Sequence, residues 1–167
     1  MKINEDLLPK IEYETNMPAP IIGMISVDGN PTISKTMRYG GVQIPWNVLS
    51  SSASARTETN LSSYFELRDG LIYYKGTKRA VIHFDVEVEV YGNDTLYLLY
   101  GDINGYYRTT SSFVKNTLGG NHSNGSASVI VKNGDYLSFQ VGAPEAFSNL
   151  TVGTSRCWIQ VLGFLNN

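Results

Sequence analysis

The chain has 167 residues, of which 42% are hydrophobic and 17% are charged, and its net charge is −2. This length allows one domain with its own core, and the hydrophobic fraction excludes a disordered chain. Without a strong positive charge, binding to nucleic acid or to an anionic membrane surface is not expected, and no apolar run is long enough for membrane insertion. The single cysteine, Cys157, excludes a disulfide scaffold.

Residues 1–60 differ in composition from the rest of the chain. Five of the six prolines lie in the first 45 residues, and proline fixes φ and removes a backbone donor. This region is therefore predicted to be an extended N-terminal anchor arm that ends in a flexible linker at residues 49–60. In the alternative interpretation, part of it adds one or two early strands to the same domain. The first residues lack the basic start and long apolar core of a secretory signal.

From residue 61 onward the chain consists of short alternating runs separated by turns rich in Gly, Asn and Asp. Runs of this length and spacing predict the antiparallel strands of an all-β sandwich or barrel. No segment keeps a 3.6-residue period over ten residues, so the helix content is expected to be low. We therefore assign residues 61–167 to one head domain.

The stretch AVIHFDVEVEV at residues 80–90 has carboxylates at every second position. Side chains alternate between the two faces of a strand, so Asp85, Glu87 and Glu89 share one face and their apolar neighbours share the other. Acids two residues apart lie roughly 6.5–7 Å from each other, which would suit a pair of glycosidase carboxylates. A catalytic acid, however, needs a buried or apolar setting. The pattern therefore favours a solvated face, or acids paired with basic groups of this chain or of another subunit, and it predicts no enzyme.

Metal and cofactor sites are not expected. His83 and His122 have no Cys, His or carboxylate at the spacing of zinc ligands. The glycine-containing stretch 101–105 resembles the start of a calcium loop but lacks the acidic ligands that should follow. No glycine-rich phosphate loop opens a helix.

Five side chains near two turns are candidates for binding a glycan or receptor. Aromatic faces and planar amides bind sugars, and tyrosine provides contact area at low entropic cost. In the alternative interpretation the tyrosines cover the ends of the sandwich or line a contact between subunits. The candidates are Tyr106, Tyr107, Arg108, Asn121 and His122.

Three stretches resemble the jelly-roll heads of the tumour-necrosis-factor and complement-type superfamily. The resemblance covers residues from about 64 to 167 and implies an antiparallel jelly roll whose last strand lies in the inner sheet. It also implies a homotrimer about a three-fold axis, with Tyr136, Trp158 and Phe164 at the interface. The three stretches are KGTKRAVIHFDVEVEV at 75–90, NGDYLSFQV at 133–141 and RCWIQVLGFL at 156–165.

Similar heads occur on bacteriophage fibres and receptor-binding proteins. The resemblance therefore implies a structural protein of the virion surface, a short trimeric fibre or knob that assembles in the host cytoplasm. The N-terminal arm would attach to capsid or tail proteins through Ile44, Pro45 and Trp46, and the head would face outward toward a host glycan. Two alternatives from other classes remain: a free-standing carbohydrate-binding module or lectin, and a glycan-degrading enzyme that uses the acids of residues 80–90.

Overall fold

The computed structural model describes residues 11–12, 21–36, 38, 40–50, 61–92, 98–115 and 119–166. Within these ranges the chain forms strands and one short 3-10 helix, η2 (Leu61–Ser63), and no helix there is long and apolar enough to cross a membrane. The prediction of low helix content is therefore confirmed for this part of the chain. The strands are β1 (Ile11–Glu12), β2 (Ile21–Val27), β3 (Thr32–Lys35), β4 (Gly41–Gln43), β5 (Val48–Ser50), β6 (Phe65–Arg68), β7 (Leu71–Tyr74), β8 (Arg79–Tyr91), β9 (Leu98–Ile103), β10 (Tyr106–Ser112), β11 (Val114–Lys115), β12 (Asn121–Val131), β13 (Tyr136–Gly142), β14 (Phe147–Val152) and β15 (Ser155–Leu165).

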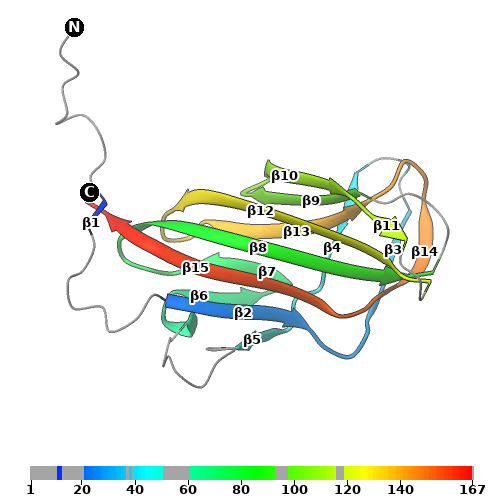
Figure 1. The fold of residues 1–167 in the computed structure, drawn as a ribbon, viewed down its shortest axis with the longest axis horizontal. Coiled ribbons are helices and arrows are strands. Elements are labelled where there is room, and N and C mark those ends of the chain that lie inside the picture. The colour runs from blue at the N-terminus through cyan, green and yellow to red at the C-terminus, as the bar shows by residue number, and fades with distance from the viewer. Residues whose placement is uncertain are drawn as a thin grey trace, which may run out of the picture.

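Two antiparallel sheets pack face to face. The nine-stranded sheet has the order β11-β12-β8-β15-β2-β5, and β14, β3 and β1 join it off this path. The six-stranded sheet has the order β10-β9-β13-β7-β6, with β4 beside β13. Figure 1 shows β12, β8, β15 and β2 as the front layer. The predicted fold class, an all-β antiparallel sandwich, is confirmed.

The core lies between the sheets and is supplied by every second residue of the long strands. Phe84 of β8 meets Phe139 of β13 edge-on, with 5.3 Å between the ring centroids. The next strand of the front layer, β15, adds Cys157 and Ile159, which are fully buried. Each fully buried large side chain stabilises the fold by roughly 1.5–3 kcal/mol, so this alternating pattern provides much of the folding free energy.

Residues 21–50 belong to the same sandwich, which corrects the domain boundary predicted at residue 60. β2 pairs with β15 on one side and with β5 on the other, and β4 pairs with β13. Ile25 of β2 is fully buried. The prolines leave these strands intact because Pro31 precedes β3 and Pro45 lies between β4 and β5. The alternative interpretation of the sequence, one or two early strands that join the head, is closer, although this segment supplies four strands, β2 to β5.

The three predicted anchor residues lie in the connection between β4 and β5. Ile44 and Trp46 are buried, Pro45 is half-buried, and the Trp46 ring centroid lies 5.7 Å from that of Phe139. This connection crosses from the six-stranded to the nine-stranded sheet, so its apolar side chains fill the core and are not available to a capsid or tail protein. The other parts of the predicted arm and linker, residues 1–10, 13–20 and 51–60, lie outside the described residues.

A buried lysine holds two connections together beside β3. Lys35 is 4% exposed. Its Nζ donates hydrogen bonds to the carbonyl oxygens of Ala143, of Arg38 at 3.1 Å and of Glu145 at 3.3 Å. The side chains of Arg38 and Glu145 also form an exposed ion pair at 3.4 Å. Because a charged donor strengthens each hydrogen bond, this ammonium group fixes both connections to β3.

Candidate binding face on the nine-stranded sheet

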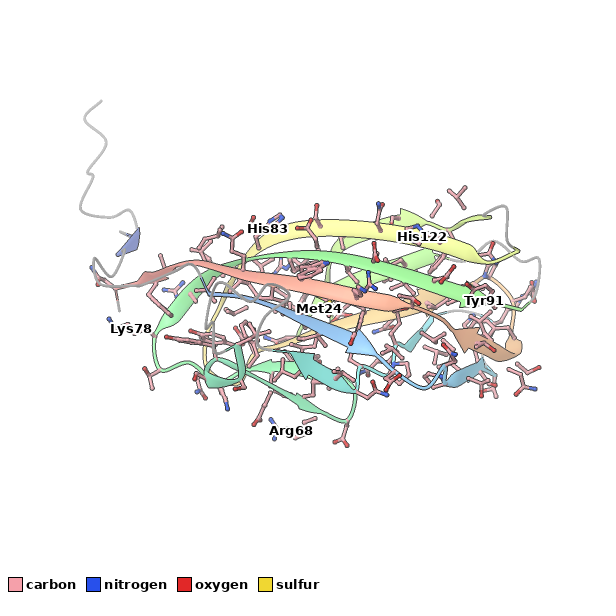
Figure 2. All side chains as sticks on the ribbon, turned by 60° about the horizontal axis from the view of Figure 1, so that its bottom comes forward. Met24, Arg68, Lys78, His83, Tyr91 and His122 are labelled. Atoms are coloured by element: carbon pink, nitrogen blue, oxygen red, sulfur yellow. The ribbon has the colours of Figure 1, made fainter. Side chains whose placement is uncertain are left out.

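The acids of β8 point away from the core, as the alternating pattern predicts. Phe84 and Val86 are 0% and 2% exposed, whereas the side chains of Asp85 and Glu87 are 61% and 42% exposed. Figure 2 shows His83 and Tyr91, two further residues of this strand, toward opposite ends of β8, with Met24 on the nearby β2. The carboxylates therefore lie on the outward surface of the nine-stranded sheet.

Strand register determines which side chains meet the acids. Asp85 stands opposite Ser126 of β12 and Trp158 of β15, and the same two strands flank Glu87. Neighbours across paired strands lie roughly 4.5–5.5 Å apart at Cβ. A hollow of about 280 Å³ lies among these side chains. It is lined by Asp85, Val86 and Glu87 of β8, by Asn124, Gly125 and Ser126 of β12, and by Trp158. We call this part of the surface the acidic face: Asp85, Glu87, Glu89, Asn124, Ser126, Arg156 and Trp158.

Two of the carboxylates have basic partners on the same surface. Asp85 Oδ2 lies 3.4 Å from His83 Nε2, and Glu87 Oε1 lies 3.8 Å from Arg156 Nη1. His83 Nδ1 also lies 2.9 Å from Ser128 Oγ. Such pairs between exposed groups contribute about 0–1 kcal/mol each. The acidic face has three carboxylates and one guanidinium, so these residues carry a net negative charge.

The other end of the same sheet surface is apolar and basic. Ile130 and Leu162 are 46% and 38% exposed, and Val81 of β8 pairs with Ile130. Arg79 lies eight residues before Glu87 on β8, which is roughly 26 Å at 3.3 Å per residue. This cation is therefore too far away to neutralise the acidic face.

The arrangement is suited to binding. The open hollow offers carboxylate acceptors, the amide of Asn124 and the indole ring of Trp158 to a ligand or to a partner protein. A glycosidase acid works from an enclosed apolar setting, whereas Asp85 and Glu87 are exposed to water. In the part of the chain that the structure describes, no group of three or more His, Cys, Asp or Glu residues could hold a metal ion.

The five residues predicted to bind a glycan or receptor do not form one site. Tyr106 is 72% exposed at the start of β10, and Arg108 is exposed on the same strand. Asn121 and His122 begin β12, so alternation buries the first and leaves the second half-buried on the outward surface. Ser111 Oγ of β10 lies 2.7 Å from Ser123 Oγ of β12, so Arg108 is only a few residues along the strands from His122. Arg108, however, faces out of the six-stranded sheet and His122 faces out of the nine-stranded sheet, while Tyr106 lies at the far end of β10. The side chain of Tyr107 lies outside the described part of the structure.

A tight turn fixes the backbone just before Tyr106. Asn104 and Gly105 have φ values of 50° and 82°, which fit a two-residue hairpin turn of type I′. The buried Asp102 carboxylate accepts hydrogen bonds from the Gly105 N–H at 3.0 Å and from Gln140 Nε2 at 3.2 Å. Burial raises the pKa of Asp102, and these hydrogen bonds oppose the shift. The turn is therefore braced from the side of the six-stranded sheet.

Comparison with known proteins identifies the architecture. No protein-family model and no curated protein sequence matches the chain. The solved globular domain of zebrafish complement 1qA is similar, with a TM-score of 0.56 and 11% identity over 89% of this chain and 100% of that chain. Murine APRIL at pH 5.0 is also similar, with a TM-score of 0.55 and 9% identity over 85% and 99% of the two chains.

The fold is a jelly roll of the tumour-necrosis-factor and complement type. The jelly roll predicted from residues 75–90, 133–141 and 156–165 is therefore confirmed. Its last strand, β15, lies between β8 and β2 inside the nine-stranded sheet. At these low identities the likeness shows the fold alone, so the function has to be argued from the acidic face.

The three predicted interface residues lie in three different parts of the jelly roll, and one of them is in the core. Trp158 is on the acidic face. Tyr136 points outward from the six-stranded sheet, where its ring centroid lies 5.6 Å from that of Tyr73. Phe164 is buried, because a β-bulge in β15 after Val161 reverses the alternation and turns its side chain inward. Its ring centroid lies 5.6 Å from that of Tyr64. One interface cannot contain all three, and only Trp158 lies on the outward surface of the nine-stranded sheet.

Three members of the acidic face are not predicted from the sequence: Asn124, Ser126 and Arg156. Alternation within β12 and β15 places them on the outward surface once the strands are known. Their position beside Asp85 and Glu87 depends on strand pairing over long sequence distances. A shift of one residue in register would turn every side chain to the other face.

Proposed function

We propose that this jelly roll is a non-enzymatic structural and binding head that assembles into a homotrimer through the outward surface of its nine-stranded sheet. Domains of this fold typically form trimers. The observation that carries the proposal is the composition of that surface, where Trp158, Ile130 and Leu162 are partly exposed among polar groups. A sheet surface in water is usually polar, so these apolar side chains favour a surface that a second subunit covers.

The proposed setting is the surface of a bacteriophage virion, where the trimer would form a short fibre or knob assembled in the host cytoplasm. This setting is supported by the resemblance of the sequence to the heads of phage fibres. Because residues 21–50 are part of the sandwich, attachment to a capsid or tail protein falls to residues 1–20 in this proposal, with β1 tying that segment to β15. Three weak glycan sites on one rigid head would raise avidity without new contacts.

A free-standing carbohydrate-binding module or lectin is the second candidate, and the hollow in the acidic face favours it. Trp158 offers a ring on which a sugar can stack, and Asp85, Glu87 and Asn124 offer acceptors and donors for paired hydrogen bonds with sugar hydroxyls. A lectin needs the hollow open to water, so in this function no second subunit would cover the outward surface of the nine-stranded sheet.

The molecular mass in solution separates these two functions. Size-exclusion chromatography with light scattering should give about three times the 18.5 kDa mass of one chain. Trp158→Glu should lower this mass, whereas Tyr136→Ala on the other sheet should leave it unchanged. A stable monomer whose binding to a glycan array is lost in Trp158→Ala would support the lectin and reject the trimer.

The virion setting needs a separate experiment. Particles labelled with an antibody against this protein and imaged by electron microscopy should carry label at the head or tail. Particles assembled with a chain that lacks residues 1–20 should carry no label. Equal labelling of both kinds of particle would reject the proposed attachment, and unlabelled wild-type particles would reject the setting.

A further inference from the structure

The hollow in the acidic face has the chemistry of a site for a guanidinium group. Asp85 and Glu87 line it, and Trp158 forms part of its wall. Their partners on the same surface, His83 and Arg156, are 3.4 and 3.8 Å away in exposed pairs, so the carboxylates are only weakly neutralised. A guanidinium group binds carboxylates through a planar set of donors and also stacks on aromatic faces.

Two of the described arginines are available to fill such a site. Arg79 and Arg108 make no ion pair with any residue that the structure describes, and both are exposed. Arg56 lies outside the described ranges. The arginines that already have an acidic partner are Arg38 with Glu145, Arg68 with Glu66, and Arg156 with Glu87.

Arg108 lies on a flank of the molecule that is complementary to the acidic face. A bulge between Tyr107 and Thr109 interrupts the alternation of β10. The exposed residues of this strand include no acid, so Arg108 gives the strip a positive charge. Figure 1 shows β10 near β12 at one side of the sandwich. We call this strip the β10 flank: Tyr106, Arg108, Thr110 and Ser112.

The β10 flank and the hollow lie at the same level along the strands. Gly125 of β12 lines the hollow. A Cβ atom placed on Gly125 would lie 3.0 Å from Oγ1 of Thr109, the neighbour of Arg108. Thr109 turns toward β12, whereas Arg108 points to solvent from the six-stranded sheet. The guanidinium is therefore level with the hollow but on another side of the same molecule.

We propose that the β10 flank of one copy lies on the acidic face of the next copy, with the guanidinium of Arg108 in the hollow between Asp85 and Glu87. The inference rests on the proposed trimer. Rotation about an axis parallel to the strands does not change the position of a residue along the strand direction. Arg108 of one copy therefore stays at the same height along the strands as the hollow of the next copy. Arg79 stays roughly 26 Å away along β8 under the same rotation. Such head-to-tail contacts can close into a ring.

Charge reversal in the full chain tests this contact. Arg108→Glu and Glu87→Lys should each weaken self-association by more than about tenfold, as expected for a charge pair that water no longer screens. The double variant should recover most of the lost affinity, because it restores an opposite pair at each contact. Sedimentation equilibrium measures the association, and far-UV circular dichroism verifies the fold. Arg108→Gln serves as a milder variant where a reversal disturbs folding.

Two further variants make the outcome decisive. Glu66→Lys places the same charge change on the six-stranded sheet and should leave self-association unchanged. If Arg79→Glu dissociates the assembly and Arg108→Glu does not, the copies meet face to face about a two-fold axis and the inference is wrong. A wild-type trimer that Arg108→Glu leaves intact also overturns the inference but retains the proposed function. A wild-type monomer overturns both.

Discussion

The buried ammonium of Lys35 should contribute measurably to stability, and Lys35→Met tests this contribution. Methionine keeps a long apolar side chain but removes the donors to three carbonyl oxygens. The carbonyl of Ala143 is buried, so loss of its charged partner should destabilise the fold by about 1–3 kcal/mol. The carbonyls of Arg38 and Glu145 are partly buried, so water can replace the ammonium there. Loss of each of these hydrogen bonds should lower the free energy of unfolding by about 0.5–1 kcal/mol.

The desolvation penalty of the buried ammonium acts in the opposite direction, since the variant no longer has to bury a charge. The expected balance is a loss of about 2–3 kcal/mol in the free energy of unfolding. For a domain of this size that loss lowers Tm by roughly 4–12 °C. An unchanged or raised Tm would show that desolvation of the ammonium cancels its hydrogen bonds, and the reasoning would be refuted.

Thermal and urea unfolding followed by circular dichroism measure this effect. Wild type and variant must be compared at the same chain concentration, because association raises the apparent stability of an oligomer. Lys132→Met is the matched control, since Lys132 is exposed after β12. A surface change of this kind should alter the free energy of unfolding by no more than about 0.5 kcal/mol.

Three further predictions concern the sandwich. In Gly23→Ala the new Cβ would clash with the side chain of Leu61, so urea unfolding should show a loss of about 1–3 kcal/mol; an unchanged midpoint would mean that β2 is not part of the core. Because burial raises the pKa of Asp102, its contribution to stability is full below about pH 3.9 and is lost as the pH rises through the folded-state pKa. Asp102→Asn can still accept the hydrogen bond from Gly105, and it should flatten the fall in the urea midpoint as the pH rises above about 4; a fall as steep as that of the wild type would contradict this assignment. Burial raises the pKa of the Cys157 thiol, so a thiol reagent should modify it only at the rate of unfolding, and rapid modification of native protein would refute the packing of β15.

The orientation of β8 could be predicted from the sequence because alternation depends only on the strand itself. The same rule fails for Phe164, since a bulge adds one residue to β15 and turns the side chain inward. The prolines predict an irregular arm, but Pro31 and Pro45 lie at strand ends, where the missing N–H leaves the ladder intact. The local sequence of residues 21–50 therefore does not predict that these residues form strands of the sandwich.

The candidate site could be predicted only in part. Residues 80–90 indicate three outward acids, but the hollow forms where β12 and β15 bring Asn124 and Trp158 beside them. That pairing joins segments far apart in the sequence, and no local pattern specifies it. The buried Lys35 is also unpredictable, because lysine is almost never fully buried and its acceptors are backbone carbonyls from distant connections.

The position of β15 between β8 and β2 has a consequence for biosynthesis. A ribosome that has translated the chain as far as residue 154 has made both neighbours of β15 but not the strand that joins them. During that interval β8 and β2 present open edges and apolar faces, which readily pair with other nascent chains. We therefore expect production of soluble protein to improve with slower translation or added chaperone, which protect the unfinished sheet until its last strand emerges.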